Sequence, residues 1–241
     1  MYEPSKAQRQ YLLHKKREKQ FIAVSRILLF LLFLALWEVS ARLNWIDSFI
    51  FGSPSLIAGT FIQMCMDQSL FSHIGITLAE TLISFFLVVL LGIGTAVLLW
   101  ACPKLAQILE PYLVVLNSLP KSALAPLLIV WLGANMKTIV VAGMSVAIFG
   151  SIINLYTGFC EIDPEKRKLI ATLGGGKKDE LFKIVLPSSV PLILSNMKVN
   201  IGLCLVGVII GEFIGARKGL GYLIIYGSQT FPYMYILKGS A

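Results

Sequence analysis

Long apolar runs separated by short polar stretches make up most of this chain. A helix needs about 20 predominantly apolar residues to cross the hydrocarbon core of a bilayer. Five runs meet or approach this length, at residues 21–41, 75–100, 108–131, 138–156 and 191–214. The pattern predicts an all-α, polytopic transmembrane bundle. Residues 21–241 form its transmembrane domain, and residues 1–20 form a basic cytoplasmic segment before it.

Prolines predict where two of these helices begin or break. Ser53 followed by Pro54 is typical of a helix start. The serine side chain can cap the first turn, and the N–H that proline lacks has no hydrogen-bond partner within the helix at the first position. In the third run, Pro111, Pro120 and Pro126 predict a kinked or broken helix. Such breaks are tolerated where the freed backbone groups face protein or a cavity.

Composition and charge agree with a membrane protein. The chain is 56% hydrophobic and 14% charged, whereas about 25% of an ordinary soluble domain is charged. The basic residues behind the net charge of +8 lie mostly between the apolar runs, where such residues determine membrane topology. We therefore expect no nucleic-acid partner. With the N-terminus inside, fourteen Lys and Arg residues are cytoplasmic and four are external. The charge distribution therefore predicts a cytoplasmic N-terminus.

One long polar segment interrupts the apolar pattern, at residues 161–183, and it holds eleven charged residues. Asp163 and Pro164 predict a helix start, since an acidic cap and a proline at the first position both suit the first turn. We expect this helix to end before Gly174, because consecutive glycines allow positive φ. A second short helix, at residues 178–185, is expected to lead into the membrane. Residues 157–187 are thus predicted to form a cytoplasmic elbow.

A nucleotide-binding loop is the alternative interpretation of this segment. Residues 171–178 read A-T-L-G-G-G-K-K and partly match the phosphate-binding pattern G-x-x-x-x-G-K-[ST]. Ala171 replaces the first glycine, Lys178 replaces the magnesium-binding hydroxyl, and a helix precedes the loop where a strand is required. We expect no cofactor, catalytic group or metal site in this chain, so any ATP would be bound by a separate subunit.

The elbow also carries a recognisable motif. Gly174, nine residues, and then Ile184-x-Leu186-Pro187 resemble the cytoplasmic loop motif of ATP-binding cassette importer permeases, E-A-A-x-x-x-G-x9-I-x-L-P. The family's acidic residue is replaced here by Lys168. Further stretches are similar to the branch for sulfonates, taurine, nitrate and related solutes. These are S-P-S at 53–55, T-L-x-E at 77–80, L-P-x-x-A-x-x-P-L-x-x-x-W-L-G at 119–133 and G-E-F-I-G-A-x-x-G-L-G-Y at 211–222.

The resemblance implies a six-helix permease of a type I importer in the bacterial inner membrane. A second permease copy, cytoplasmic ATPase subunits and an extracytoplasmic solute-binding protein would be its partners. We expect residues 233–237 to begin a sixth helix that the chain does not complete. The resemblance places ATPase coupling on the elbow, at Asp163, Pro164, Lys168, Ala171, Gly174, Ile184, Leu186 and Pro187.

Two lysines are predicted inside spans, where a central lysine costs about 2.5–3.5 kcal/mol on insertion scales. Lys121 and Lys198, together with Glu212, are therefore candidates for the translocation path. A structural ion pair with Glu80 or Glu212 remains the alternative for each lysine. The lysines favour a small anion as solute, although related permeases also serve vitamin precursors. A secondary transporter, a channel, or a nonfunctional permease fragment are the competing interpretations.

Overall fold

The computed structural model describes residues 6–43, 45–46 and 52–227, and every regular element among them is a helix. Four helices are long and apolar enough to cross a membrane, and a bent pair supplies a fifth candidate span. The predicted all-α polytopic bundle is confirmed. The expected start of a sixth helix, at residues 233–237, lies outside the described residues. The labelled helices are α1 (Lys6–Arg42), α3 (Pro54–Met66), α4 (Ser69–Ala101), α5 (Pro103–Ser118), α6 (Lys121–Leu132), α7 (Met136–Cys160), α8 (Pro164–Thr172), α9 (Lys177–Glu180), the π-helical turn η1 (Leu181–Val185) and α10 (Leu186–Gly215). Residues 220–227 are helical as well.

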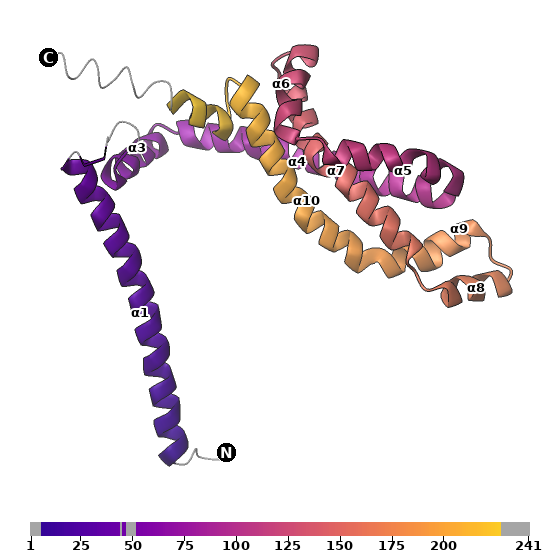
Figure 1. The fold of residues 1–241 in the computed structure, drawn as a ribbon, viewed down its shortest axis with the longest axis horizontal. Helices are drawn as coiled ribbons and strands as arrows, with labels where there is room; N and C mark the ends of the chain where they lie inside the picture. The colour runs from indigo at the N-terminus through magenta and orange to yellow at the C-terminus, as the bar shows by residue number, and fades with distance from the viewer. Residues whose placement is uncertain (1–5, 44, 47–51, 228–241) are drawn as a thin grey trace. The chain divides into compact units, whose positions relative to one another are not determined.

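The chain forms two compact units, with α1 and α3 in the first and α4 to α10 in the second (Figure 1). In the first unit, the basic residues after Lys6 belong to the same helix as the first apolar run, so α1 continues from a polar segment into a candidate span. Because the preference for helix persists across this boundary, no turn separates the two parts.

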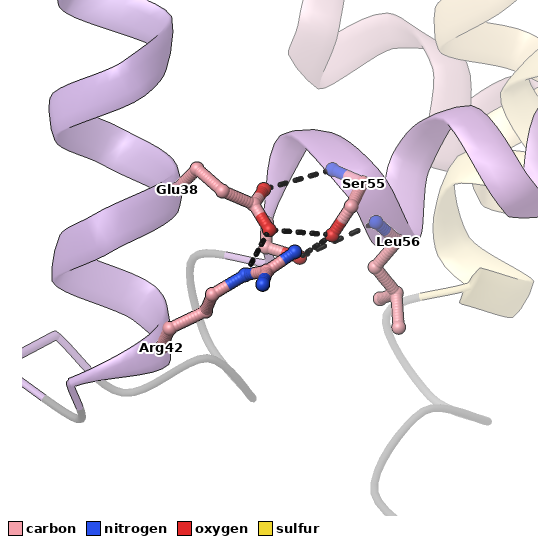
Figure 2. Close-up of polar contacts among 5 residues, drawn as sticks. Glu38, Arg42, Ser55 and Leu56 are labelled. Carbon is pink, nitrogen blue, oxygen red and sulfur yellow. Dashed lines mark hydrogen bonds and ion pairs between the residues drawn. The ribbon is translucent and has the colours of Figure 1, made fainter.

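The start of α3 is capped by two side chains, one from each helix of the first unit (Figure 2). The N–H of Leu56 donates to Ser53 Oγ at 3.3 Å, and the N–H of Ser55 donates to Glu38 Oε2 at 3.0 Å. Pro54 has no N–H, so each of the first three helical positions is accounted for. The predicted cap at Ser53 is confirmed, and Glu38 adds a carboxylate at the positive end of the helix dipole. Arg42 also binds Glu38 Oε1, at 2.8 Å.

In the second unit, α4, α7 and α10 pack against one another and form its centre (Figure 1). A Cβ on Gly207 of α10 would lie 2.9 Å from the Cα of Gly143 in α7, so only hydrogen atoms fit between the two backbones. Such small residues let membrane helices approach closely and gain dispersion contacts. Towards the elbow, larger apolar side chains fill the same interface, with Leu155, Phe159 and Val185 fully enclosed.

The third apolar run is broken once, between α5 and α6, and the two helices meet at 97°. Pro120 lies at the break and Leu119 before it is extended, as steric clash with a following proline requires. Pro111 and Pro126 remain inside their helices. The predicted break is therefore confirmed at Pro120, and the other two prolines are accommodated without one.

Candidate coupling loop and polar residues within the spans

The first helix of the elbow begins and ends as its sequence predicts. The N–H of Glu165 donates to Asp163 Oδ1 at 2.8 Å, which caps α8, and Pro164 occupies its first position. At the other end, Gly174 has a φ of +76° and the N–H of Gly175 donates to the carbonyl of Ile170 at 2.9 Å. This is a Schellman turn. The left-handed backbone at Gly174 reverses the chain, and the N–H of Gly175 then reaches a helix carbonyl that would otherwise have no partner.

The second half of the elbow corrects the sequence-based expectation. Residues 178–185 do not form a separate short helix, because α9, η1 and α10 follow one another without a break from Lys177 to Gly215. The N–H of Leu186 bonds to the carbonyl of Leu181, five residues back, so the turn is π-helical. Pro187 cannot donate to residue 183, and its ring would collide with that carbonyl in a regular helix. The wider π turn accommodates the proline without interrupting the helix.

Polar contacts fasten the elbow on both sides of its glycine turn. Arg167 of α8 forms an ion pair with Glu180 of α9. Lys177 Nζ donates to the carbonyl of Ala101, at the end of α4, at 3.3 Å. A cation at a helix C-terminus is favourable because unpaired carbonyls and the dipole both attract it. The elbow is therefore attached to the bundle by polar contacts as well as by the continuous helix.

The outer surface of the elbow combines basic and apolar side chains. Leu169 and Leu173, four residues apart on and just after α8, are 59% and 75% exposed, and Phe182 is 66% exposed. Lys168, next to Leu169, is also exposed, whereas Ile184 and Leu186 are half-buried and Leu186 packs against the core of the bundle. Exposed apolar clusters outside a lipid-facing belt are typical of protein-interaction surfaces. Ala171 lies in the last turn of α8.

Lys121 caps the broken helix pair. Its Nζ donates to the carbonyls of Leu116 and Asn117, at 2.8 and 2.9 Å, in the last turn of α5. The ammonium also lies 5.6 Å from the centre of the Phe149 ring. These contacts satisfy carbonyls that the end of α5 leaves free, and they explain how the break is tolerated. Neither Glu80 nor Glu212 contacts this lysine, so the ion pair considered for it is wrong.

Lys198 lies in the middle of α10, 12 residues after Leu186, or about 18 Å along the helix axis. Asn196 and Asn200 face α7, and Lys198 is about 200° around the helix from the first of them. Its side chain is exposed, and among the described residues no acidic group binds it. An exposed ammonium at this depth is unfavourable against lipid.

A polar cluster between α7 and α10 was not predicted from the sequence. Ser151 Oγ accepts hydrogen bonds from Asn196 Nδ2 at 2.7 Å and from Asn200 Nδ2 at 3.0 Å. Asn154 Nδ2, which is exposed, donates to Asn196 Oδ1 at 3.3 Å. Hydrogen bonds between helices are favourable in a membrane because the polar groups have few other partners there. The spacing of Asn196 and Asn200, four residues apart, was the available signal.

Glu212 is fully buried near the end of α10. Thr77 Oγ1 donates to its Oε1 at 2.6 Å, and the N–H of Gly221 donates to its Oε2 at 2.7 Å. Glu80, one turn beyond Thr77 on α4, also hydrogen-bonds to Glu212. The two acidic motifs that the sequence singled out, T-L-x-E and G-E-F-I-G-A, therefore meet in space. The translocation-path role of Glu212 stays a prediction.

Residues 88–241 match the model of the family described as binding-protein-dependent transport system inner membrane component. This match covers more than half of the chain, and the chain belongs to that family. It is a transport permease and not an enzyme. Its relatives confirm the resemblance to the sulfonate, taurine and nitrate branch of type I importer permeases.

Three relatives illustrate the range of this branch. The formylaminopyrimidine transport permease protein ThiX of Halalkalibacterium halodurans is 28% identical over 85% of this chain and 81% of its own length. The taurine transport system permease protein TauC of Escherichia coli is 23% identical over 86% of this chain and 78% of its own. The nitrate import permease protein NrtB of Synechococcus elongatus is 28% identical over 80% of this chain and 72% of its own length. The chain is thus similar along most of its length to permeases for different small solutes.

Proposed function

We propose that this chain is the membrane-spanning subunit of an ATP-driven importer in the bacterial plasma membrane, with the elbow as the docking surface for a separate ATPase. The observation that carries this proposal is the geometry of the elbow. The elbow exposes Leu169 and Leu173 beside its glycine turn and Phe182 in η1, while α9 continues through η1 into α10. A force applied to the elbow is therefore transmitted to a spanning helix, because no flexible joint separates α9 from α10.

Two copies of the chain would enclose the path, and a solute-binding protein would deliver the solute from outside. In this arrangement the N-terminus and the elbow are cytoplasmic, and residues 1–20 form a basic cytoplasmic segment. ATPase closure would move the two elbows as rigid bodies and switch the path between outward and inward access. The chain supplies no chemistry to this cycle. ATP is bound by the partner subunit alone.

The solute is a small anion or zwitterion of the taurine and nitrate kind. Lys198 supports this choice, since its exposed mid-span ammonium avoids the cost of facing lipid when it lines an aqueous path. Asn154 supports it as well, because its exposed amide, at the interface of α7 with α10, offers a hydrogen bond to a polar solute. The formylaminopyrimidine permease among the relatives makes a vitamin precursor the second candidate.

The proposed function is tested by reconstituting the chain in proteoliposomes with the ATPase and binding protein encoded beside it. We expect ATP-dependent uptake of labelled taurine or nitrate. Lys198→Met should abolish anion uptake without changing ATPase binding, and Lys198→Arg should retain it. Lys137→Met, at the exposed start of α7, is the matched control. Uptake that proceeds without ATP would refute the importer assignment in favour of a secondary transporter.

The docking surface is tested separately by exchanging its exposed leucines. Leu169→Ser and Leu173→Ser should weaken co-purification of the ATPase by at least tenfold while leaving membrane abundance unchanged. Leu12→Ser changes a leucine of α1 that is 52% exposed and lies outside the elbow, and it should have no effect. Normal ATPase binding by the elbow variants would show that the ATPase docks elsewhere.

A further inference from the structure

Two carboxyl groups contact one another inside the second unit, and no ion pair with either of them occurs among the described residues. Glu80 of α4 is 2% exposed and Glu212 of α10 is not exposed at all, and the two side chains are hydrogen-bonded. A hydrogen bond between carboxyl groups requires a proton, since two carboxylates are acceptors only. Two buried negative charges in contact would also repel one another at low dielectric.

Among the residues that the structure describes, none near the pair supplies a positive charge that could replace that proton. On α4, His73 Nδ1 accepts a hydrogen bond from the N–H of Gly219 at 2.9 Å, so this nitrogen carries no proton. Arg217 and Lys218 follow α10 but are exposed, and so is Lys137 at the start of α7. The wall that α7 presents next to Gly211 consists of apolar side chains, Ile139 and Ala142.

The donors around the pair are aimed at Glu212 and not at Glu80. Glu212 accepts from the hydroxyl of Thr77 and from the N–H of Gly221, one at each oxygen. Glu80 Oε2 is buried and has no hydrogen-bond partner among the described residues. Charged acceptors gain more from such donors than neutral ones do. The charge therefore belongs on Glu212 and the proton on Glu80.

The pair also fixes the chain that follows α10. Three consecutive backbone N–H groups, of Gly219, Leu220 and Gly221, donate to His73, Thr77 and Glu212 in turn. They open the helix that begins at residue 220, so the negative charge of Glu212 lies at its positive end. Gly219 has a φ of +110°, and a Cβ there would overlap the Glu212 carboxyl group. The segment can follow this course only with glycine at position 219.

From these contacts we propose that Glu80 remains protonated and donates its hydrogen bond to the Glu212 carboxylate, and that this acid–carboxylate pair is a clamp positioning residues 216–222 on α4. Glu80 and Glu212 are thus positioning residues of the permease, and the clamp holds the end of α10 to the start of α4. The proposal rests on the proposed function only in placing residues 216–222 on the external side. Removal of the proton would put two negative charges in one enclosed space and release the segment.

The roles of the two residues are distinguished by replacing each with glutamine. Glu80→Gln still offers an N–H donor to the Glu212 carboxylate, so the clamp should persist. Glu212→Gln replaces one accepting oxygen by a donor, which then faces Thr77 or Gly221, so the clamp should open. The measurement is hydrogen exchange at Gly219, Leu220 and Gly221 in the detergent-solubilised full chain. We expect at least tenfold faster exchange in Glu212→Gln and less than twofold change in Glu80→Gln.

A pH series tests the shared proton itself. After correction for the pH dependence of the exchange chemistry, the parent protein should lose protection at residues 219–221 under alkaline conditions, whereas Glu80→Gln should not. Glu110→Gln, an exposed glutamate on α5, is the matched control and should follow the parent. This comparison needs only Glu80→Gln to fold. Equal pH profiles for parent and Glu80→Gln, or greater loss of protection in Glu80→Gln than in Glu212→Gln, would overturn the proposal.

These measurements use no transport assay. A failure of uptake with normal protection at residues 219–221 would count against the proposed function alone. Loss of the predicted asymmetry in a protein that transports normally would count against the clamp alone. The two proposals therefore fail in distinguishable ways.

Discussion

Replacing Gly174 perturbs the elbow at one backbone angle and nowhere else. Its φ is +76°, and a Cβ built on it would have no other atom within 4 Å. The whole cost is therefore conformational, and a left-handed backbone costs a residue with a Cβ roughly 1–2 kcal/mol. A β-branched side chain is more restricted still. An energy of this size lowers the population of the native turn by a factor of about 5–30.

The local assay for this perturbation is hydrogen exchange at Gly175, whose N–H closes the turn by bonding to Ile170. Gly174→Val should speed this exchange by at least about fivefold. Gly174→Asn should lie between valine and the parent, since asparagine tolerates the left-handed region best among residues with a Cβ. Gly176→Ser is the matched control, because Gly176 has a φ of −91° and open space beside it.

The functional assay follows from the proposed docking role. A distorted turn misplaces the exposed leucines of the elbow, so Gly174→Val should reduce ATPase co-purification and ATP-dependent uptake at normal membrane abundance. Unchanged protection of Gly175 in Gly174→Val would refute the argument from backbone strain. Faster exchange of the Gly175 N–H together with normal ATPase binding and uptake would support the argument from backbone strain and contradict the docking role of the elbow.

Further predictions address other parts of the chain. Labelling with an impermeant thiol reagent in intact cells, on a cysteine-free background, should modify a cysteine at position 55 and spare one at position 178; the reverse pattern would overturn the topology. Ser53→Ala should destabilise the start of α3 by about 1 kcal/mol, visible as faster exchange at the Leu56 amide, and Ser53→Asp should restore it. Lys121→Met should lower the thermal midpoint in detergent, with Lys121→Arg closer to the parent. Lys168→Glu should not improve ATPase binding, and a gain would show that the docking groove still expects the family's acidic residue.

Helix boundaries were predictable from the sequence where residues within about one helical turn determine them. The cap at Asp163, the cap at Ser53 and the glycine turn at Gly174 each depend on groups no more than five residues apart. The continuity of α9 with α10 was not predictable in this way. Local rules place a helix boundary at Pro187, whereas in the structure a π turn accommodates the proline and Val185 of that turn is buried against α4 and α7.

The roles of the ionisable residues depended on contacts between distant parts of the chain. Lys121 was predictable as a costly group within a span, but the carbonyls that it binds became available only because the helix breaks at Pro120. Lys198 remains a predicted path residue, and its exposure follows from which face of α10 packs on α7.

The sequence by itself determined that this protein is a polytopic helical permease, where most of its helices lie, and which segment reverses at a glycine. These properties follow from apolar length, from capping within one turn and from the sterics of single residues. Only the tertiary structure decided that Glu80 and Glu212 share one buried contact, because Thr77 and Glu212 are 135 residues apart in the chain and are joined only by the packing of α4 with α10. Charge and burial at such a contact depend on the partner that folding brings to it, and no local pattern contains that partner.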